Sequence, residues 1–477
     1  MKSSVAIHGH FYQPPRTDPF TGQDSVDPYV VDQTGGKYKS WNEIISDQCY
    51  KPNADLGNFS LISFDLYRSL AEWLERNQSA VYYKIIQNDQ IAFRNDGFGS
   101  AFCGSWDHAI LPLLTTEDKE LEIYWGYHDY VKRFGHIPVG FWLAETAVSF
   151  DVLDILAKNG LRLVILAEWQ ASNPVDTTKV YWVNLREGRR ICVAFYDKQL
   201  SDNLSFNSQA MIDADQFARN YISSRNLHET QIMLGATDGE RYGHHLTQGE
   251  KFLNRLLTKS VPDVNMTSTT LMKAFAQVSP KDEAFIKDNT SWSCLCGELK
   301  RWKQDCECCV DYDRNNMRVS GQWKTTLFNA INTLSQNLVA ITDSMLSKLL
   351  INPTEAKKEY IHVHLHTMTE SEFLAKHQRK PLDAHDIHIV MKACQLQMYR
   401  LAAYTSCGWF FSDLDRPEPR IVIGNMKKAL SMLADLGQVE HMMNLEKTFT
   451  FELSNAKSNF TGKSGKDLYL EYRSLLG

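Results

Sequence analysis

Two carboxylates that directly follow apolar runs give this sequence its strongest indication of chemistry. Glu145 follows the run Gly-Phe-Trp-Leu-Ala at 140–144, and Asp238 follows Ile-Met-Leu-Gly-Ala-Thr at 232–237. Each run is typical of a buried strand, and the strands of a parallel α/β barrel all end at one common mouth. Two carboxyl groups that meet there could divide acid, base and nucleophile roles, as cleavage of a bond between two sugars requires.

Both carboxylates also have an ordinary structural interpretation. A helix is expected shortly downstream of Glu145, whose charge would then be stabilised by the helix dipole. Asp238 could cap a solvated turn, but Glu240, His244 and His245 follow it closely. Two neighbouring carboxylates repel each other, which raises the pKa of one and keeps it protonated as a potential acid. This cluster therefore favours a functional interpretation.

Several histidines could belong to the same site. His8 and His10 flank a glycine at the end of the first apolar run, and His108 follows Trp-Asp ahead of another apolar run. A buried histidine pair and a helix capped by Asp107 explain these residues equally well. A metal site at the first pair would need further ligands at the same mouth. Alternating histidines at 362–366 are interpreted as a polar helix or strand face.

Five cysteines lie close together in the sequence, namely Cys294, Cys296, Cys306, Cys308 and Cys309. Their spacings differ from the Cys-x2-Cys pairs that are usual in zinc sites. Clustered buried thiols are therefore favoured over a zinc site, which stays open. No metal ion or other cofactor is expected in the catalytic site.

The composition limits the classes of function. The net charge is −6, hydrophobic residues make up 43% and charged residues 23%, which is ordinary for a globular protein. No general affinity for nucleic acid or an anionic membrane is expected. We find no apolar stretch that resembles a signal peptide or spans a bilayer, so the expected location is the cytoplasm. The sequence leaves the oligomeric state open.

The elements that must position these residues alternate between strand and helix in the first part of the chain. A first strand is expected at 4–10, and residues 17–58 are interpreted as a long ordered excursion. Alternation of this kind predicts a parallel α/β barrel over residues 1–285. Helices are expected at 63–77, 117–134, 150–159 and 209–226, and strands at 138–143, 161–166, 191–195 and 231–236.

The pattern changes after about residue 285. Long amphipathic segments at 321–350, 385–405 and 422–448 follow one another without clear strands between them, and 355–380 is interpreted as a helical hairpin loop. We therefore predict a helical domain over residues 286–477, which completes an α/β architecture with two domains.

Six segments, taken in order, resemble the family-57 glycoside hydrolases, and most of all a bacterial subgroup of that family. Each segment alone would be a weak match, but six in the right order are specific. The segments span nearly the whole chain and lie at 7–16, 106–113, 140–148, 236–245, 291–294 and 405–411.

The resemblance implies an incomplete seven-stranded (β/α) barrel followed by a helical domain that helps to form the cleft. It implies a retaining enzyme that acts on α-glucans or oligosaccharides, by hydrolysis or by glycosyl transfer through a covalent glycosyl-enzyme. Glu145 then falls on the family's nucleophile and Asp238 on its general acid/base. The residues that fall on sugar-binding positions are His10, Gln13, His108, Trp142, Glu240, His244 and Trp409.

The sequence departs from the family's pattern at a few positions that leave both carboxylates unchanged. Cys296-Gly297 stands where the subgroup has His-Gly, Ala144 stands where proline is common, and 97–104 is only loosely similar. These departures leave the acceptor side of the cleft, and hence the exact substrate, open.

Two other classes of function stay under consideration. A metal-dependent polysaccharide deacetylase or α-mannosidase-like hydrolase on a related barrel would use His8, His10 and Asp238 as ligands. A non-catalytic sugar-binding relative is the other alternative, although such a protein would be expected to lack one of the two carboxylates.

Overall fold

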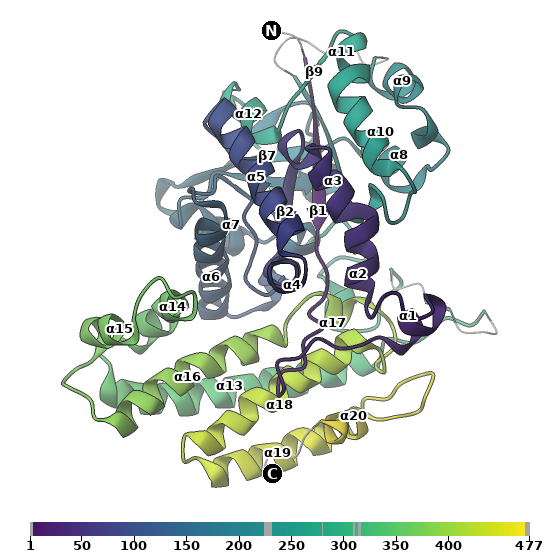
Figure 1. The fold of residues 1–477 in the computed structure, drawn as a ribbon. Coiled ribbons are helices and arrows are strands. Elements are labelled where there is room, and N and C mark those ends of the chain that lie inside the picture. Colours follow the sequence, from purple (N-terminus) through teal and green to yellow (C-terminus); the bar gives the residue numbers. More distant parts are fainter. Residues whose placement is uncertain (1–2, 224–230, 279, 309–310, 313–315, 473–477) are drawn as a thin grey trace. The chain divides into compact units, whose positions relative to one another are not determined.

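A computed structural model of the chain divides into two compact units, each described separately (Figure 1). The first unit contains residues 1–13, 26–106 and 129–292, and the second contains 14–25, 107–128 and 293–477. The described residues are 3–223, 231–278, 280–308, 311–312 and 316–472. The domain boundary at residues 285/286 stays a prediction.

The first unit is built on parallel strands that form a barrel. Hydrogen bonding orders one sheet as β3-β2-β1-β8, with β9 on β1, and the other as β4-β5-β7-β6. Among the strands of the described residues, only β6 runs antiparallel to its neighbour. The strands are β1 (Ser4–Phe11), β2 (Ser63–Leu66), β3 (Ala101–Phe102), β4 (Gly140–Phe141), β5 (Leu163–Ala167), β6 (Val180–Asn184), β7 (Arg190–Tyr196), β8 (Ile232–Asp238) and β9 (Thr267–Ser268).

Backbone hydrogen bonds connect the sheets at two places. The Cys103 N–H donates to the Gly140 carbonyl over 3.0 Å, which joins β3 to β4, and the Asp197 N–H donates to the Leu234 carbonyl over 2.7 Å, which joins β7 to β8. Within the described residues, seven parallel strands thus follow one another as β8-β1-β2-β3-β4-β5-β7. The single bond between β7 and β8 leaves the barrel incomplete, which confirms the predicted fold.

Helices of the first unit lie between and after the strands along the chain (Figure 1). They are α1 (Pro28–Gln33), α2 (Trp41–Ile45), α3 (Lys51–Asp55), α4 (Arg68–Asn77), α5 (Ser79–Asp96), α7 (Phe150–Lys158), α8 (Lys198–Phe206), α9 (Ala214–Phe217), α10 (Gly249–Arg255), α11 (Val261–Asp263) and α12 (Leu271–Ala276). Helix α6 (Thr116–Phe134) belongs to the second unit up to His128 and to the first from Asp129.

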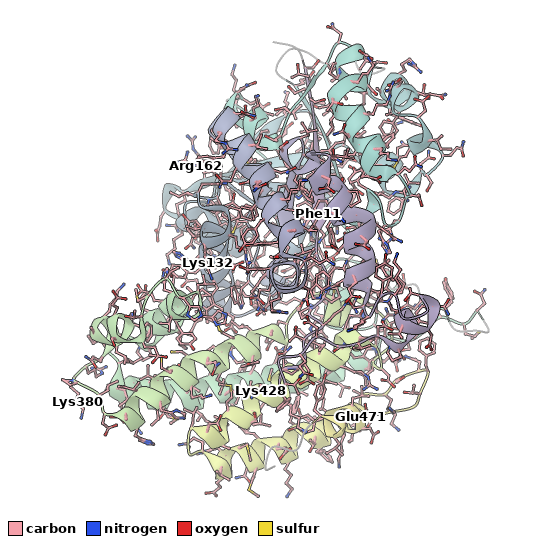
Figure 2. All side chains as sticks on the ribbon, viewed as in Figure 1. Phe11, Lys132, Arg162, Lys380, Lys428 and Glu471 are labelled. Atoms are coloured by element: carbon pink, nitrogen blue, oxygen red, sulfur yellow. The ribbon has the colours of Figure 1, made fainter. Side chains whose placement is uncertain are left out.

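Aromatic packing forms part of the barrel's core. Phe11 lies in the interior of the first unit (Figure 2), where its ring centroid is 4.9 Å from that of Phe59. Phe64 completes the cluster at 4.9 Å from Phe59, and all three side chains are fully buried. Burying each such ring stabilises the fold by about 1.5–3 kcal/mol, so the cluster fixes the ends of β1 and β2.

One predicted helix begins later than expected. The spacing of apolar residues predicts a helix over 63–77, but residues 63–66 form β2 and the helix α4 starts at Arg68. All four residues of β2 are buried, so both of its faces pack against protein. The chain leaves the strand at Tyr67, whose ψ of 151° is extended. This correction places Asp65 at the end of a barrel strand.

The second unit is helical, as predicted for the C-terminal part of the chain. The long helices α13, α16, α18 and α19 lie side by side (Figure 1). The segment expected as one helix at 422–448 is two helices, because Gly437 adopts a left-handed φ of 72° between them. The helices are α13 (Trp323–Leu349), α14 (Pro353–His364), α15 (Glu370–His377), α16 (Ala384–Ala402), α17 (Cys407–Phe410), α18 (Pro417–Asp435), α19 (Val439–Leu453) and α20 (Gly465–Glu471).

None of the helices in the described ranges combines the length and the apolarity needed to cross a membrane.

Candidate active site

Strand register brings three polar side chains to the same level of the barrel. His10 on β1 pairs with Asp65 on β2 and, on the other side, with Asp238 on β8. All three positions lie at the carboxyl ends of their strands, where barrel enzymes place their chemistry. The register therefore assembles a carboxylate–imidazole–carboxylate row from residues that are far apart in the sequence.

Asp65 holds both histidines of the first motif. His8 Nε2 lies 3.0 Å from Asp65 Oδ1, and His10 Nδ1 lies 2.8 Å from Asp65 Oδ2. Burial by itself lowers the pKa of His10, but the charge and hydrogen bond of Asp65, helped by Asp238 and Glu145, raise that pKa to about 9. Burial lowers the pKa of His8. At neutral pH the pair therefore consists of a neutral His8 and a charged His10.

Asp65 was missed in the sequence because it lies within the segment interpreted as a helix. The signal that could have found it is the local alternation in Ser-Phe-Asp-Leu, which a short strand also produces. Its ion pair with His10 leads to a prediction about stability.

We expect Asp65→Asn to lower the free energy of unfolding by about 3 kcal/mol at pH 6, because it leaves a buried charge without its partner. The folded pKa of His10 lies above its ordinary value of 6.5. Its contribution is therefore fully present below pH 6.5 and is lost as the pH rises through about 9. Denaturant unfolding at pH 6 and pH 10 should show the larger difference at pH 6.

Asp129→Asn is a matched control for this measurement. Asp129 is also buried, but its partner is Arg133, with Nε–O distances of 2.9 and 3.0 Å. Because arginine does not titrate in this range, the cost of that substitution should be equal at both pH values. An equally pH-independent cost for Asp65→Asn would contradict the assignment of a charged His10.

Glu145 occupies a strained backbone conformation directly after β4. Its φ is 57° and that of Thr146 is 49°, so two consecutive residues with side chains are left-handed. Each costs on the order of 1–3 kcal/mol and persists only where the surroundings impose it. Strain of this kind is concentrated at functional sites, and here it occurs directly after β4.

A hydrogen-bond network holds this strained segment. Ser291 Oγ donates to the Glu145 carbonyl over 2.8 Å, and the Trp292 N–H donates to Thr146 Oγ1 over 2.9 Å. Gln170 Nε2 donates to the Thr146 carbonyl over 2.8 Å. The network therefore replaces the regular backbone pairing that the left-handed turn interrupts.

Aromatic rings lie around the carboxylate and the two histidines. Trp292 Nε1 donates to Glu145 Oε2 over 3.0 Å. Trp142 packs edge-on against Trp292, with centroids 5.2 Å apart, and stacks on His8 at 4.5 Å and on His10 at 5.3 Å. Trp142 is fully buried, so its burial favours support of the histidines, and its contact with a sugar stays a prediction.

Asp238 is the exposed member of the row. Asp238 is exposed to solvent, while Gly239 and Glu240, which follow it in the next turn, are buried. A Cβ at Gly239 would lie only 2.4 Å from the Phe11 ring, so the chain needs glycine here. Desolvation by the surrounding protein raises the pKa of Asp238 despite its exposed surface, and the charge of Glu145 raises it further, against the opposing effect of His10.

Glu240 is buried behind Asp238 and accepts two hydrogen bonds. Tyr50 Oη donates to Glu240 Oε1 over 2.7 Å, and Gln13 Nε2 donates to the same atom over 3.4 Å. Burial, together with the charge of Asp238, raises the pKa of Glu240 to about 7 against the hydrogen bond from Tyr50. Glu240 is therefore partly protonated near neutral pH. The sequence pointed to Glu240 as the carboxylate that raises the pKa of Asp238, but that carboxylate is mainly Glu145.

His244 follows in the same turn. Its Nδ1 lies 2.7 Å from Gln48 Oε1, and its ring meets that of Trp41 edge-on at 6.2 Å. Burial lowers the pKa of His244, and the nearby His245 lowers it further, so His244 is neutral at physiological pH. The segment expected as an ordered excursion thus supplies Tyr50, Gln48 and Trp41 to this side of the barrel.

His108 and Trp409 belong to the second unit. His108 Nδ1 lies 2.5 Å from Ser406 Oγ, and the Ser406 N–H donates to the His108 carbonyl over 2.9 Å. Trp409 is almost fully buried and donates from Nε1 to the Ala403 carbonyl over 3.1 Å. These contacts connect two of the family-like segments within this unit, and the contact of either residue with a sugar stays a prediction.

An incomplete seven-stranded parallel barrel that carries two carboxylates at the carboxyl ends of its strands fits the class of glycoside hydrolases. The model of glycosyl hydrolase family 57 matches residues 31–287, more than half of the chain, and the protein belongs to this family. A second model, described as a domain of unknown function (DUF3536), matches residues 320–473. No curated protein matches the sequence.

Solved structures share the fold at low sequence identity. An exo-type maltose-forming amylase from Pyrococcus sp. ST04 has a TM-score of 0.75 and 15% identity, over 99% of this chain and 88% of its own. A branching enzyme of family 57 from Thermococcus kodakaraensis has a TM-score of 0.61 and 14% identity, over 98% of both chains. A 4-α-glucanotransferase from Thermococcus litoralis has a TM-score of 0.58 and 14% identity, over 90% of this chain and 60% of its own.

Proposed function

We propose that the protein is a retaining enzyme that cleaves or transfers the α-1,4 linkages of an α-glucan. The observation that carries the proposal is the pair of carboxyl groups, Glu145 and Asp238, at the carboxyl ends of barrel strands, close enough for one charge to raise the pKa of the other. Membership of family 57 supports it. So do the activities named for structures of this fold: amylase, branching enzyme and glucanotransferase.

The two carboxyl groups have different surroundings, which suits different roles. A general acid must hold its proton at the working pH, and the raised pKa of Asp238 favours that state. A nucleophile must be oriented, and Glu145 is held by the Trp292 indole and by the network around its backbone. We therefore assign Asp238 as the general acid/base and Glu145 as the nucleophile.

The reaction then proceeds in two steps, the formation and the breakdown of a covalent glycosyl-enzyme. Asp238 gives its proton to the glycosidic oxygen as that bond breaks, and a Glu145 oxygen forms a bond to the anomeric carbon. In the second step the ionised Asp238 takes a proton from water or from a glucan hydroxyl, whose oxygen attacks the same carbon and releases Glu145. Water as the acceptor gives hydrolysis, and a glucan hydroxyl gives transfer.

The remaining candidate residues would bind the sugar. His10, Gln13, Glu240 and His244 belong to the first unit, as the two carboxylates do, and we propose that they hold sugar hydroxyls. A charged His10 would donate a hydrogen bond, whereas a neutral His244 could donate or accept one. That His108 and Trp409 also contact a sugar stays a prediction from the sequence.

A metal-dependent hydrolase is less well supported. His8 and His10 point their nitrogens at separate oxygens of Asp65, and these side chains do not form a cluster of converging ligand atoms within the described part of the chain. Asp65 instead contacts both His8 and His10, and so it holds the two imidazoles in place.

The test is incubation of the purified protein with maltooligosaccharides and glycogen. New reducing ends indicate hydrolysis, and a redistribution of chain lengths without new reducing ends indicates transfer. Product analysis by NMR within the first turnovers should show the α-anomer, as retention requires. Inversion, or activity only on acetylated or mannose-containing glycans, would overturn the proposal.

The indole of Trp292 supplies a separate prediction. We expect Trp292→Phe, which keeps an aromatic ring but removes the donor to Glu145, to lower kcat/KM by about 10- to 150-fold, since a hydrogen bond to a charged group is worth about 1.5–3 kcal/mol. Steady-state kinetics and thermal unfolding should be measured together.

Trp182→Phe is the matched control, because the Trp182 indole donates to the Pro280 carbonyl instead of a carboxylate. It should leave kcat/KM unchanged. Equal kinetics for Trp292→Phe and the wild type would contradict the role given to Trp292.

A further inference from the structure

Four cysteines of the second unit gather where two Cys-x-Cys segments meet. The Sγ atoms of Cys294, Cys306 and Cys308 lie within 4.8 Å of one another. Cys296 Sγ lies 3.2 Å from Cys308 Sγ, and Cys294 Sγ lies 3.8 Å from Cys306 Sγ. Over the described ranges, this is the single group of three or more side chains with metal-binding atoms at such short mutual distances. Cys309 lies outside the described residues.

We propose that Cys294, Cys296, Cys306 and Cys308 bind one Zn²⁺ ion as a tetrathiolate. Zinc holds thiolate sulfur at about 2.3 Å in a tetrahedron, which places any two sulfurs about 3.8 Å apart. The separations of 3.2 and 3.8 Å are close to this edge length. They are well beyond the roughly 2.05 Å of a disulfide bond, and all four residues are free thiols.

Backbone N–H groups already point at the sulfurs. Those of Leu295 and Cys296 donate to Cys308 Sγ, and that of Arg301 donates to Cys294 Sγ. Four thiolates around a divalent cation carry a net charge of −2, which such donors stabilise. Partners of this kind orient metal ligands, and clustered neutral thiols would not need them.

Two arginines add positive charge beside the cysteines. Arg318 Nη2 donates to the Cys306 carbonyl over 2.7 Å, and Arg301 Nη2 donates to the Cys308 carbonyl. Both guanidinium groups are thereby held against the second Cys-x-Cys segment. Arg318 is also paired with Asp305 over 2.9 Å, so the charge of Arg301 is the one that offsets the negative charge of a tetrathiolate.

The backbone between the two segments turns back sharply. Gly297, Glu298 and Leu299 have φ values of 75°, 53° and 55°, so three residues in a row are left-handed. This turn returns the Arg301 N–H to Cys294. The two left-handed residues with side chains cost on the order of 1–3 kcal/mol each, which metal binding would offset.

The site is of the structural type. Cys294 and Cys306 are buried, and four protein ligands leave no position for water or substrate. Each thiol that binds zinc gives its proton to solvent, so affinity falls as the pH is lowered. The inference is independent of the proposed catalytic function.

The test is elemental analysis of the full chain purified from zinc-supplemented medium without chelators. We expect about one Zn²⁺ per chain, lost in Cys306→Ser and retained in Cys407→Ser, a control in the same unit outside the cluster. Removal of the zinc with a chelator should expose four thiols to a thiol reagent and lower the thermal midpoint.

A spectroscopic measurement on the wild type covers the case in which Cys306→Ser fails to fold. Exchange of zinc for Co²⁺ should give the intense sulfur-to-cobalt absorption of a tetrahedral thiolate site. A metal-free protein with four free thiols or two disulfides by mass spectrometry would overturn the proposal. Bound iron, or a cobalt spectrum without thiolate bands, would overturn the assignment of a zinc tetrathiolate.

Discussion

The substitution Glu145→Gln is expected to reduce turnover on α-glucans by at least about a thousandfold while leaving the fold intact. The amide oxygen can still accept the hydrogen bond from the Trp292 indole, so the strained turn keeps its contacts. What is lost is the negative charge that bonds to the anomeric carbon. Steady-state rates and thermal unfolding, measured on the same preparation, separate loss of chemistry from loss of structure.

Glu145→Ala extends this test by opening space beside the anomeric carbon. A small anion such as azide should enter that space, attack from the same face and restore turnover, with release of a β-glycosyl azide. This product identifies the nucleophile, because no structural role of Glu145 would produce it.

Glu187→Gln is the matched control for Glu145. Glu187 also has a left-handed backbone, with a φ of 54°, but its side chain is exposed and pairs with Arg189. Its substitution should leave turnover unchanged. Wild-type activity in Glu145→Gln would remove the nucleophile assignment.

The substitution Asp238→Asn is expected to lower kcat/KM on α-glucans by about 10²–10⁴-fold, the usual contribution of a general acid. An aryl α-maltoside with a good leaving group does not need protonation, so formation of its glycosyl-enzyme should be nearly unaffected. A burst of released phenol followed by slow turnover would show that the second step has become limiting.

The pH profile gives an independent measure of the same residue. A general acid works only while protonated, so wild-type activity should fall as the pH rises through the raised pKa of Asp238. Asp238→Asn should lose this alkaline limb. An unchanged limb in the variant would assign it to another group, such as Glu240.

Asp197→Asn is the control for a carboxylate at a strand end. Asp197 follows β7 and caps α8 by accepting a hydrogen bond of 2.7 Å from the Leu200 N–H. Because asparagine caps helices about as well as aspartate, its substitution should cost less than about 1 kcal/mol of stability and leave kcat/KM unchanged. Equal losses of kcat/KM in Asp197→Asn and Asp238→Asn would contradict the assignment of Asp238 as the acid, because a carboxylate with a structural role would then have the same effect.

Much of the barrel could be predicted because several of its strands have a recognisable local sequence pattern. Segments such as Leu163–Ala167 are buried on both faces and form continuous apolar runs, as the strands of parallel sheets do. β2 was missed because its four residues directly precede a helix whose apolar spacing extends back over them. The error concealed Asp65, the residue that positions both histidines.

The sequence by itself determined which chemical groups the protein has and in what order they follow its strands. Glu145, Asp238 and the His-Gly-His motif could be recognised because residue type and local pattern are properties of short segments. The division of the chain into a barrel part and a helical part follows from the same local patterns.

Only the tertiary structure decided how these groups act on one another. The pairing of His10 with Asp65 and Asp238 depends on strand register between segments up to more than two hundred residues apart. A pKa depends on desolvation and on all nearby charges, which only the folded chain brings together. In the fold, Glu145 is the main carboxylate that raises the pKa of Asp238. The cysteine spacing disfavoured a zinc site, yet folding brings the Sγ atoms of Cys294, Cys306 and Cys308 within 4.8 Å of one another and that of Cys296 within 3.2 Å of Cys308.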